Sequence, residues 1–312
     1  MTMDMGDLRD RPTLRGKLER DAPLARFTSW RAGGRAELLF RPADRDDLAG
    51  FVRTLPAATP IHVLGLGSNT LVRDGGVRGA VIVMHDPGAA RAVADGLIYA
   101  EAGVASPKVA RLAARLGCED AAFLAGVPGT LGGALAMNAG CYGGETWNHV
   151  VRVEVLGRDG RFEVRPRTDY AIGYRSVRRA DGTPPDGIFT AAWLSFSPGD
   201  AARARARIRE LLAKRIASQP LSLPNAGSVF RNPPGDHAAR LIEAAGLKGH
   251  AIGGARVSEL HANFIVNPGG RARASDIEAL IEHVRATVRE RFGVDLETEV
   301  RIVGERPQGE GR

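Results

Sequence analysis

The 312-residue chain has few cysteines, few aromatic residues and no long hydrophobic run, and each shortage excludes a class of protein. Its two cysteines, Cys118 and Cys141, lack Cys-x-x-Cys spacing, so they predict neither a zinc site nor a disulfide framework. Aromatic residues make up 5% of the chain, too few for a base-stacking platform. No segment reaches the length of a membrane span, and residues 1–20 lack the apolar core of a secretory signal. We therefore expect a cytoplasmic protein with no membrane insertion and no bound metal.

Lysine is also scarce, although the chain is basic. Lys and Arg number 43 against 36 Asp and Glu, for a net charge of +7, but only four of these cations are lysines. The arginines are spread along the chain among Ala and Gly. A nucleic-acid or membrane surface would gather them in a stripe, so we expect no nucleic-acid partner. A mild positive charge suits an anionic small ligand equally well.

Glycine, in contrast, is concentrated in residues 117–145, which hold eight glycines and almost no charge in their middle. Glycine at this density destabilises a core helix, exposes backbone N–H groups and lets a ligand approach closely. Thr130, followed by Leu131, predicts the start of a short helix whose N-terminus would face an anion. We interpret the stretch as a cradle for a large, flat, phosphate-bearing cofactor. A glycine-rich surface loop is the alternative.

A second glycine loop follows the strand predicted at residues 61–64. Gly65 and Gly67 let backbone amides converge on a phosphate, and Ser68 and Asn69 add short polar side chains. A Rossmann loop would open a helix and be followed by an acidic residue about 20 positions later, whereas this loop leads into extended chain and a turn. The pattern favours a diphosphate contact outside the Rossmann family, with a tight strand–strand turn as the alternative.

Apolar periodicity predicts alternating strands and helices with no internal repeat. Strands are expected at residues 36–40, 61–64, 80–83, 97–100, 150–156, 161–164, 188–196, 263–266 and 299–303. Helices are expected at residues 44–55, 106–117, 200–219, 238–245 and 275–292. Ser106 fits an N-cap, and Ser275 with Glu278 fits a capping box. Residues 1–20 fit a polar leader or a frayed helix.

Two polar groups are ambiguous on spacing alone. Ser228 fits a hydroxyl donor or a nucleophile, but Phe230 breaks the G-x-S-x-G pattern, so loop hydrogen bonding is the alternative. Glu259, His261 and Asn263 would share one face of a strand, where they would bind a sugar or a metal, or form a polar edge.

Two pairs are weaker signals. Arg175, after Tyr174, carries a cation able to clamp a carboxylate or phosphate, but arginine is abundant in this chain. Glu297 and Glu299 would share one face of the terminal strand, where simple solvent exposure is the alternative.

Taken together and in order, these segments resemble one family, UDP-N-acetylenolpyruvoylglucosamine reductase, over roughly residues 24–304. The likeness is carried by eight ordered segments: FTSWRAGG, GLGSN with VRDGG, AGVPGTLGGALAMNAGCYGGE, GYR, NAGSVFRNP, LIEAAGLKG, VSELHANFIVN and FGVDLETEVR. Eight matches in order are far more specific than one glycine loop.

The resemblance implies an α+β fold that contains α/β units. A two-domain FAD-binding fold of the vanillyl-alcohol-oxidase type (the PCMH type) would be followed by a third, α+β substrate-binding domain. The expected domains are residues 1–86 joined by 299–312, residues 87–200, and residues 201–298. Residues 157–175 form a short segment, which implies the lid-less type II subgroup. We expect a monomer.

The resemblance also implies an activity: NADPH-dependent, FAD-mediated reduction of UDP-N-acetylglucosamine enolpyruvate to UDP-N-acetylmuramate in peptidoglycan precursor synthesis. Ser228 would donate a proton, Arg175 would stabilise an enolate and Glu299 would assist. The residues implied for FAD binding are Gly65, Gly67, Ser68, Asn69, Gly126, Val127, Pro128, Gly129, Thr130, Gly132, Gly133, Asn138, Ala139 and Gly140. Those implied for substrate contact are Arg215, Asn232 and Glu259. A flavin oxidase of the same fold, acting on another small substrate, is the alternative.

Overall fold

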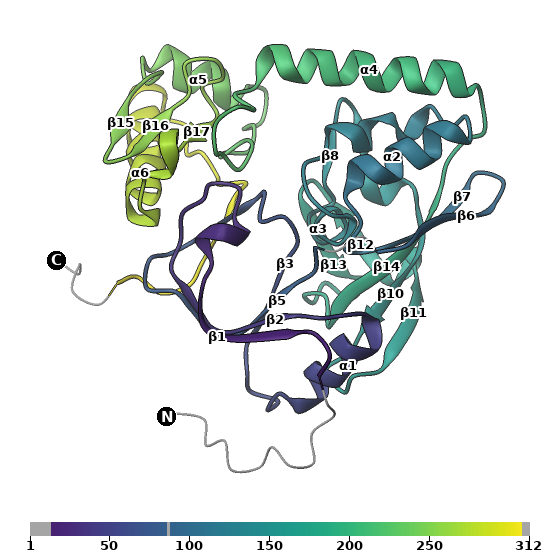
Figure 1. Cartoon of the computed structure of the whole chain (residues 1–312). Coiled ribbons are helices and arrows are strands. Elements are labelled where there is room, and N and C mark those ends of the chain that lie inside the picture. The colour runs from purple at the N-terminus through teal and green to yellow at the C-terminus, as the bar shows by residue number, and fades with distance from the viewer. Residues whose placement is uncertain (1–13, 86–87, 308–312) are drawn as a thin grey trace.

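The computed structural model describes residues 14–85 and 88–307, which form separate sheets and helix clusters bridged by one long helix (Figure 1). Residues 1–13 of the expected leader lie outside the described residues. Residues 17–20 belong to strand β1 (Lys17–Pro23), so the frayed-helix prediction is wrong there. The mixture of helices with parallel and antiparallel strands confirms the predicted α+β class.

The first sheet has the strand order β1-β2-β5-β3. Its other strands are β2 (Arg35–Arg41), β5 (Val77–Val83) and β3 (Ile61–Leu64). Strands β2 and β3 both run parallel to β5, and helix α1 (Arg45–Thr54) packs on the sheet through stacked Phe40 and Phe51 rings. The glycine loop at residues 65–69 follows directly from the carboxyl end of β3 and leads into strand β4 (Thr70–Val72).

The last strand of the described residues returns to this loop. Strand β18 (Arg301–Val303) pairs in parallel with β4 (Thr70–Val72), which directly follows the glycine loop at residues 65–69. The Asn69 side chain donates a hydrogen bond to the Glu299 carbonyl (3.2 Å). Residues 230 positions apart in the sequence therefore meet beside the loop.

The second sheet is antiparallel, with the order β11-β10-β14-β7-β6. Its strands are β6 (Ala90–Ala94), β7 (Leu97–Glu101), β10 (Val150–Leu156), β11 (Phe162–Pro166) and β14 (Ile188–Ser195). Between β7 and β10 lie α2 (Ser106–Arg115), the 3-10 helix η2 (Asp120–Gly126), α3 (Leu131–Met137) and the small strands β8 (Gly140–Cys141) and β9 (Gly144–Glu145). A hairpin of β12 (Tyr170–Gly173) and β13 (Ser176–Arg179) packs beside α3.

The start of α2 differs from the prediction. Ala105, in extended conformation, is the N-cap, and Ser106 is already helical. The Ser106 N–H donates to the Gly129 carbonyl (3.0 Å), so the glycine stretch holds the backbone of Ser106. The Ser106 side chain is buried. Pairing between these two segments, not side-chain capping, fixes where the helix begins.

Helix α4 (Ala201–Ser218) crosses from the second sheet's helices to the last group of elements, along the top of Figure 1. That group contains α5 (Ala238–Ala244), the small sheet β15 (Ala251–Ile252), β16 (Ala255–Val257) and β17 (Ile265–Val266), and α6 (Ala274–Phe292). Its apolar core is built mainly from α5, α6 and β16. Within the described ranges, none of the helices has the length and apolarity needed to cross a membrane.

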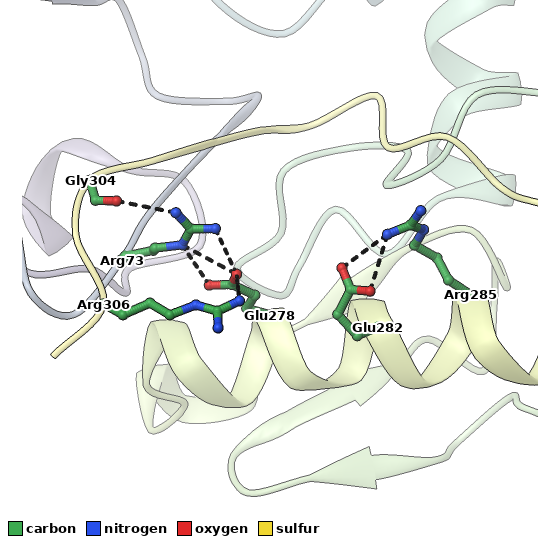
Figure 2. A network of polar contacts seen from close by, with 6 residues as sticks. All are labelled: Arg73, Glu278, Glu282, Arg285, Gly304 and Arg306. Atoms are coloured by element: carbon green, nitrogen blue, oxygen red, sulfur yellow. Dashed lines mark hydrogen bonds and ion pairs between the residues drawn. The ribbon is translucent and has the colours of Figure 1, made fainter. Parts of the chain in front are cut away.

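A network of charges fastens α6 to the segments that follow β4 and β18 (Figure 2). Arg73, after β4, donates through Nε and Nη2 to the Glu278 carboxylate and through Nη1 to the Gly304 carbonyl, and Arg306 also contacts Glu278. Arg73 holds the pKa of the Glu278 carboxyl below its ordinary value. Asp74 accepts hydrogen bonds from two N–H groups at the start of α6. The last group of elements is therefore fixed relative to the glycine loop at residues 65–69.

This network explains why the predicted capping box is wrong. Helix α6 begins one residue before Ser275, and the carboxylate that accepts the N–H of Arg273 belongs to Asp276 (2.9 Å). Glu278 is instead occupied by the Arg73 guanidinium. Local spacing predicted that Glu278 caps the helix, but a long-range ion pair with Arg73 binds its carboxylate.

Candidate functional site

One cleft, with a cavity volume of about 300 Å³, gathers most of the predicted cofactor and catalytic residues. Its walls come from the loop after β3, the segment before α3, the end of α4, the loop at 226–228 and the approach to β18. The predicted cofactor residues in its lining are Gly65, Gly67, Ser68, Asn69, Gly126, Val127, Pro128, Gly129, Thr130, Gly133, Ala139 and Gly140. The predicted catalytic residues Arg175, Ser228 and Glu299 lie in the same lining.

The two glycine loops are packed against each other. The Ser68 hydroxyl donates to the Pro128 carbonyl (2.8 Å), and a Cβ on Gly65 would collide with the Thr130 hydroxyl. Gly129 has φ +125°, a conformation that side chains disfavour. Thr130 caps α3 by accepting from the Gly133 N–H, which confirms the short helix predicted to start there. The stretch is thus a partly buried wall of the cleft, and the surface-loop alternative is wrong.

Gly132 and Asn138 are the two predicted cofactor residues that do not line the cleft. The Gly132 N–H donates to the Ala102 carbonyl (2.8 Å), and a Cβ there would meet the Ala102 Cβ at 2.9 Å. Gly132 therefore packs against the sheet side of α3, while its neighbour Gly133 is exposed toward the cleft. Asn138 is fully buried.

Arg175 and Glu299 form an ion pair on the cleft wall. Arg175 Nε donates to Glu299 Oε1 at 2.6 Å, and both side chains are about 15% exposed. The Tyr174 hydroxyl donates to the other Glu299 oxygen (3.4 Å), and the Arg175 guanidinium lies 4.9 Å from the Tyr174 ring centre. Arg175 adopts φ +52° in the β12–β13 turn, a conformation that costs about 1–2 kcal/mol for a residue with a side chain. The surrounding contacts hold the strained residue in place.

Ser228 is placed in the cleft by the chain that follows it. The Val229 N–H donates to the Asn263 carbonyl, and the Asn263 side chain bonds both the N–H and the carbonyl of Phe230 (2.9 and 2.8 Å). The Val229 carbonyl in turn accepts from the Glu299 N–H (2.7 Å). Ser228 and Glu299 are therefore fixed by one shared piece of backbone.

Arg215, on the last turn of α4, faces the cleft without a counter-charge. Its Nε donates to the Gln219 side chain (2.9 Å), and no carboxylate in the described part of the chain pairs with it. Burial lowers the pKa of its guanidinium. A partly buried cation of this kind needs an anion, and carboxylates and phosphates both suit the guanidinium fork.

The composition of the lining suits FAD. Among the described residues, it contains three arginines (Arg175, Arg215 and Arg301) against a single carboxylate, that of Glu299. The glycine loops allow close approach of a diphosphate, and apolar side chains such as Val127 and Met137 offer surface to a flat ring system. The residues present therefore fit the group that the sequence predicts.

Two predicted substrate residues lie outside the lining of this cleft. The Asn232 side chain accepts the Ala238 N–H at the start of α5 (3.1 Å), and Glu259 is exposed and packs over Gly249. Residues 258–264 form turns rather than a strand, so the prediction that Glu259, His261 and Asn263 share a strand face is wrong. The Asn263 side chain is buried, where it forms hydrogen bonds with the N–H and the carbonyl of Phe230.

The two glutamates near the chain's end also separate. Glu297 is largely exposed and lies 3.6 Å from an Arg231 nitrogen, whereas Glu299 faces the cleft. The terminal strand starts at Arg301, not at 299, because only the residues from 301 onward pair with β4. Arg301 was missed by the sequence reasoning, although its position two residues after Glu299 on an extended segment was a usable signal.

Other lining residues gave no sequence signal. Met137, Gln219 and Phe264 look like ordinary helix or core residues until the fold brings them together. Cys141 also lines the cleft, and its thiol contacts the Phe123 carbonyl (3.1 Å). Burial raises the pKa of the Cys141 thiol to about 11, which suits a packing role. In the part of the chain that the structure describes, no group of three His, Cys, Asp or Glu side chains is arranged to hold a metal.

Known protein families match this chain over two ranges of residues that contribute to the cleft. Residues 36–164 match the family described as FAD binding domain, and residues 219–303 match the C-terminal domain of UDP-N-acetylenolpyruvoylglucosamine reductase. The UDP-N-acetylenolpyruvoylglucosamine reductase of Thiobacillus denitrificans is 54% identical, with 95% of this chain and 94% of the relative covered. That of Methylococcus capsulatus is 52% identical, with 98% and 99% covered.

A solved structure agrees with these matches. The crystal structure of UDP-N-acetylenolpyruvylglucosamine reductase from Thermus caldophilus has a TM-score of 0.76 and 34% sequence identity to this chain, covering 92% of this chain and 99% of its own. These findings confirm the family resemblance and the FAD prediction. The chain belongs to the UDP-N-acetylenolpyruvoylglucosamine reductases, which are FAD oxidoreductases of peptidoglycan precursor synthesis.

Proposed function

We propose that this cleft carries out the NADPH-dependent reduction of UDP-N-acetylglucosamine enolpyruvate to UDP-N-acetylmuramate. The observation that carries the proposal is the meeting of the paired glycine loops with Arg175, Ser228 and Glu299 in one cleft. The two glycine loops would hold FAD, and the bound cofactor would supply the hydride-transfer chemistry between NADPH and the methylene carbon of the enolpyruvyl group. Side chains of this protein stabilise the charge that develops on the substrate and donate the proton.

Arg175 stabilises the negative charge that the substrate gains. Addition of hydride to the methylene carbon leaves the neighbouring carbon with enolate character, shared with the attached carboxylate. A guanidinium placed where that charge develops lowers the barrier, because its position is fixed before the reaction begins. The 2.6 Å bond to Glu299 and the bonds to the cradle carbonyls hold Arg175 in that position.

Ser228 donates the proton that completes the product. An alcohol is a weak acid, but an enolate carbon is a strong base, so transfer succeeds when the hydroxyl is held in line. The backbone bonds of Val229 and Phe230 supply that rigidity. Glu299 assists by orienting Arg175 and by sharing a backbone connection with the serine loop.

Arg215 binds the substrate's diphosphate, since its partly buried cation faces the cleft. Asn232 and Glu259 remain predicted substrate contacts at positions beyond the cleft lining. The domain boundaries 1–86 with 299–312, 87–200 and 201–298, and the lid-less subgroup, also remain proposals. The monomeric state and the cytoplasmic location also remain proposals.

The test is a pair of anaerobic half-reactions on the purified protein. It should carry a yellow flavin that NADPH bleaches and that UDP-N-acetylglucosamine enolpyruvate then reoxidises. A colourless protein that FAD does not reconstitute would contradict the proposal. A flavin that NADPH leaves oxidised, but that another small substrate reduces, would indicate a flavin oxidase instead.

A further inference from the structure

Asn138 uses every polar atom of its side chain in a fully buried position. Its Nδ2 donates to Glu145 Oε2 (2.9 Å) and to the Gly173 carbonyl (3.1 Å), and its Oδ1 accepts the Trp147 N–H (3.1 Å). Its backbone is left-handed, with φ +42°, at the end of α3. Asparagine is the residue type that tolerates this conformation and supplies both donors and an acceptor.

Asn138 is connected to Arg175 in two ways. Its side chain holds Gly173, which lies two residues before Arg175 at the mouth of the β12–β13 turn. Its own carbonyl accepts from Arg175 Nη1 (3.3 Å), beside the Gly140 carbonyl that accepts from Nη2 (3.0 Å). One buried residue therefore fixes both the base of the turn and the guanidinium.

The need for such support follows from the backbone of Arg175. A side-chain-bearing residue with φ +52° persists only where its surroundings hold it there. If the turn were released, the residue would relax toward negative φ and the guanidinium would leave its place. A shift of about 1 Å in a group that orients or stabilises the reacting atoms can cost about 10²-fold in rate.

We propose that Asn138 is a positioning residue for Arg175, and not the cofactor contact that the family motif implied. The proposal rests on the catalytic role proposed above for Arg175. It predicts that Asn138 affects the step that needs Arg175 while leaving FAD affinity unchanged.

The main variant is Asn138→Asp. Aspartate keeps the size and the tolerance for left-handed backbone, but it removes the two amide donors and sets a carboxylate against Glu145 and the Gly173 carbonyl. In rapid-mixing experiments we expect reoxidation of the flavin by the enolpyruvyl UDP-sugar to slow about 10²-fold. Reduction by NADPH and the dissociation constant for FAD should stay unchanged. Asn138→Gly, which also accepts φ +42° but adds no charge, should act in the same direction if the aspartate variant fails to fold.

Asn267 offers a matched control, because it is also fully buried and satisfied. Its side chain donates to the Trp30 carbonyl (2.8 Å) and accepts the Ala272 N–H (2.7 Å), away from Arg175. Asn267→Asp should lower the unfolding temperature, as Asn138→Asp does, but leave the reoxidation rate of the folded, flavin-loaded protein unchanged.

The deciding experiment repeats Asn138→Asp in an Arg175→Gly background. If Asn138 acts through Arg175, the second substitution adds no further loss of reoxidation rate to the Arg175→Gly protein. An equal loss in both backgrounds, or a weakened FAD affinity with normal reoxidation, would overturn the positioning role. Normal reoxidation in Arg175→Gly alone would refute the catalytic role of Arg175 in the proposed function, and the positioning role with it.

Discussion

Gly133 offers a sharp test of the glycine cradle, because a methyl group added there meets almost no protein. A Cβ on Gly133 would have the Thr130 hydroxyl oxygen, 3.9 Å away, as its nearest neighbour, and the residue is exposed on the cleft wall. Gly133→Ala should therefore stabilise the FAD-free protein, since alanine is favoured over glycine in a helix by up to about 1 kcal/mol.

The same methyl group occupies space that we assign to the cofactor. We expect the dissociation constant for FAD to rise at least tenfold, which corresponds to about 1.4 kcal/mol of lost binding free energy. Because the stabilisation by a bound ligand grows with the logarithm of its affinity, the variant should gain stability without FAD and lose that gain at saturating FAD. Urea unfolding with and without FAD, together with an equilibrium titration of the flavin, measures both quantities.

The neighbouring Gly132 supplies the control. A Cβ there would lie 2.9 Å from the Ala102 Cβ, against the sheet and away from the cleft lining. Gly132→Ala should cost about 1–3 kcal/mol of stability through overpacking, with FAD affinity unchanged in the protein that folds. Unchanged FAD affinity in Gly133→Ala would refute the assignment of the glycine wall to the cofactor.

Further predictions concern the charged groups and the cleft thiol. Glu299→Gln should slow flavin reoxidation about 10²-fold through loss of the charged partner of Arg175, and normal turnover would contradict its role. Glu278→Gln should lower the free energy of unfolding by about 1.5 kcal/mol at pH 7, near the lower end for bonds to charged groups because Arg73 is partly exposed. The folded-state pKa of Glu278 lies below its unfolded value of 4.5. The stability deficit of the variant should therefore be complete above pH 4.5 and shrink as pH falls through the folded pKa. A stability deficit that does not change with pH would exclude the ion pair. Cys141, with a pKa of about 11, should resist iodoacetamide at pH 8 until the protein is unfolded; rapid labelling of the folded protein would contradict the raised pKa.

Short-range sequence patterns predicted the α-helices and half of the strands that the described residues form, because those elements depend on local spacing and turn residues. The start of α3 at Thr130 is an example, since the cap and the glycines that follow it act within four residues. Patterns failed where a distant segment supplied the decisive partner. Glu278 was predicted to cap a helix but pairs with Arg73. Ser106 was predicted as an N-cap, but its backbone N–H bonds the Gly129 carbonyl.

The site was predicted in the same uneven way. The family resemblance implied that Arg175, Ser228 and Glu299 act together, but residue spacing alone gave no physical reason for them to share a cleft. Their meeting depends on the return of β18 to β4 and on backbone bonds between the Val229 carbonyl and the Glu299 N–H, which no local pattern encodes. The buried role of Asn138 was hidden for the same reason.

The most direct test of the whole account is rapid mixing with the Ser228→Ala variant. NADPH should reduce its bound flavin at the wild-type rate, because the serine hydroxyl has no part in that step. Reoxidation by UDP-N-acetylglucosamine enolpyruvate should then slow by about 10²–10⁴-fold, the usual cost of removing a positioned acid. Equal loss of both half-reactions, or reoxidation at the wild-type rate, would contradict the role of Ser228 as the proton donor in this cleft.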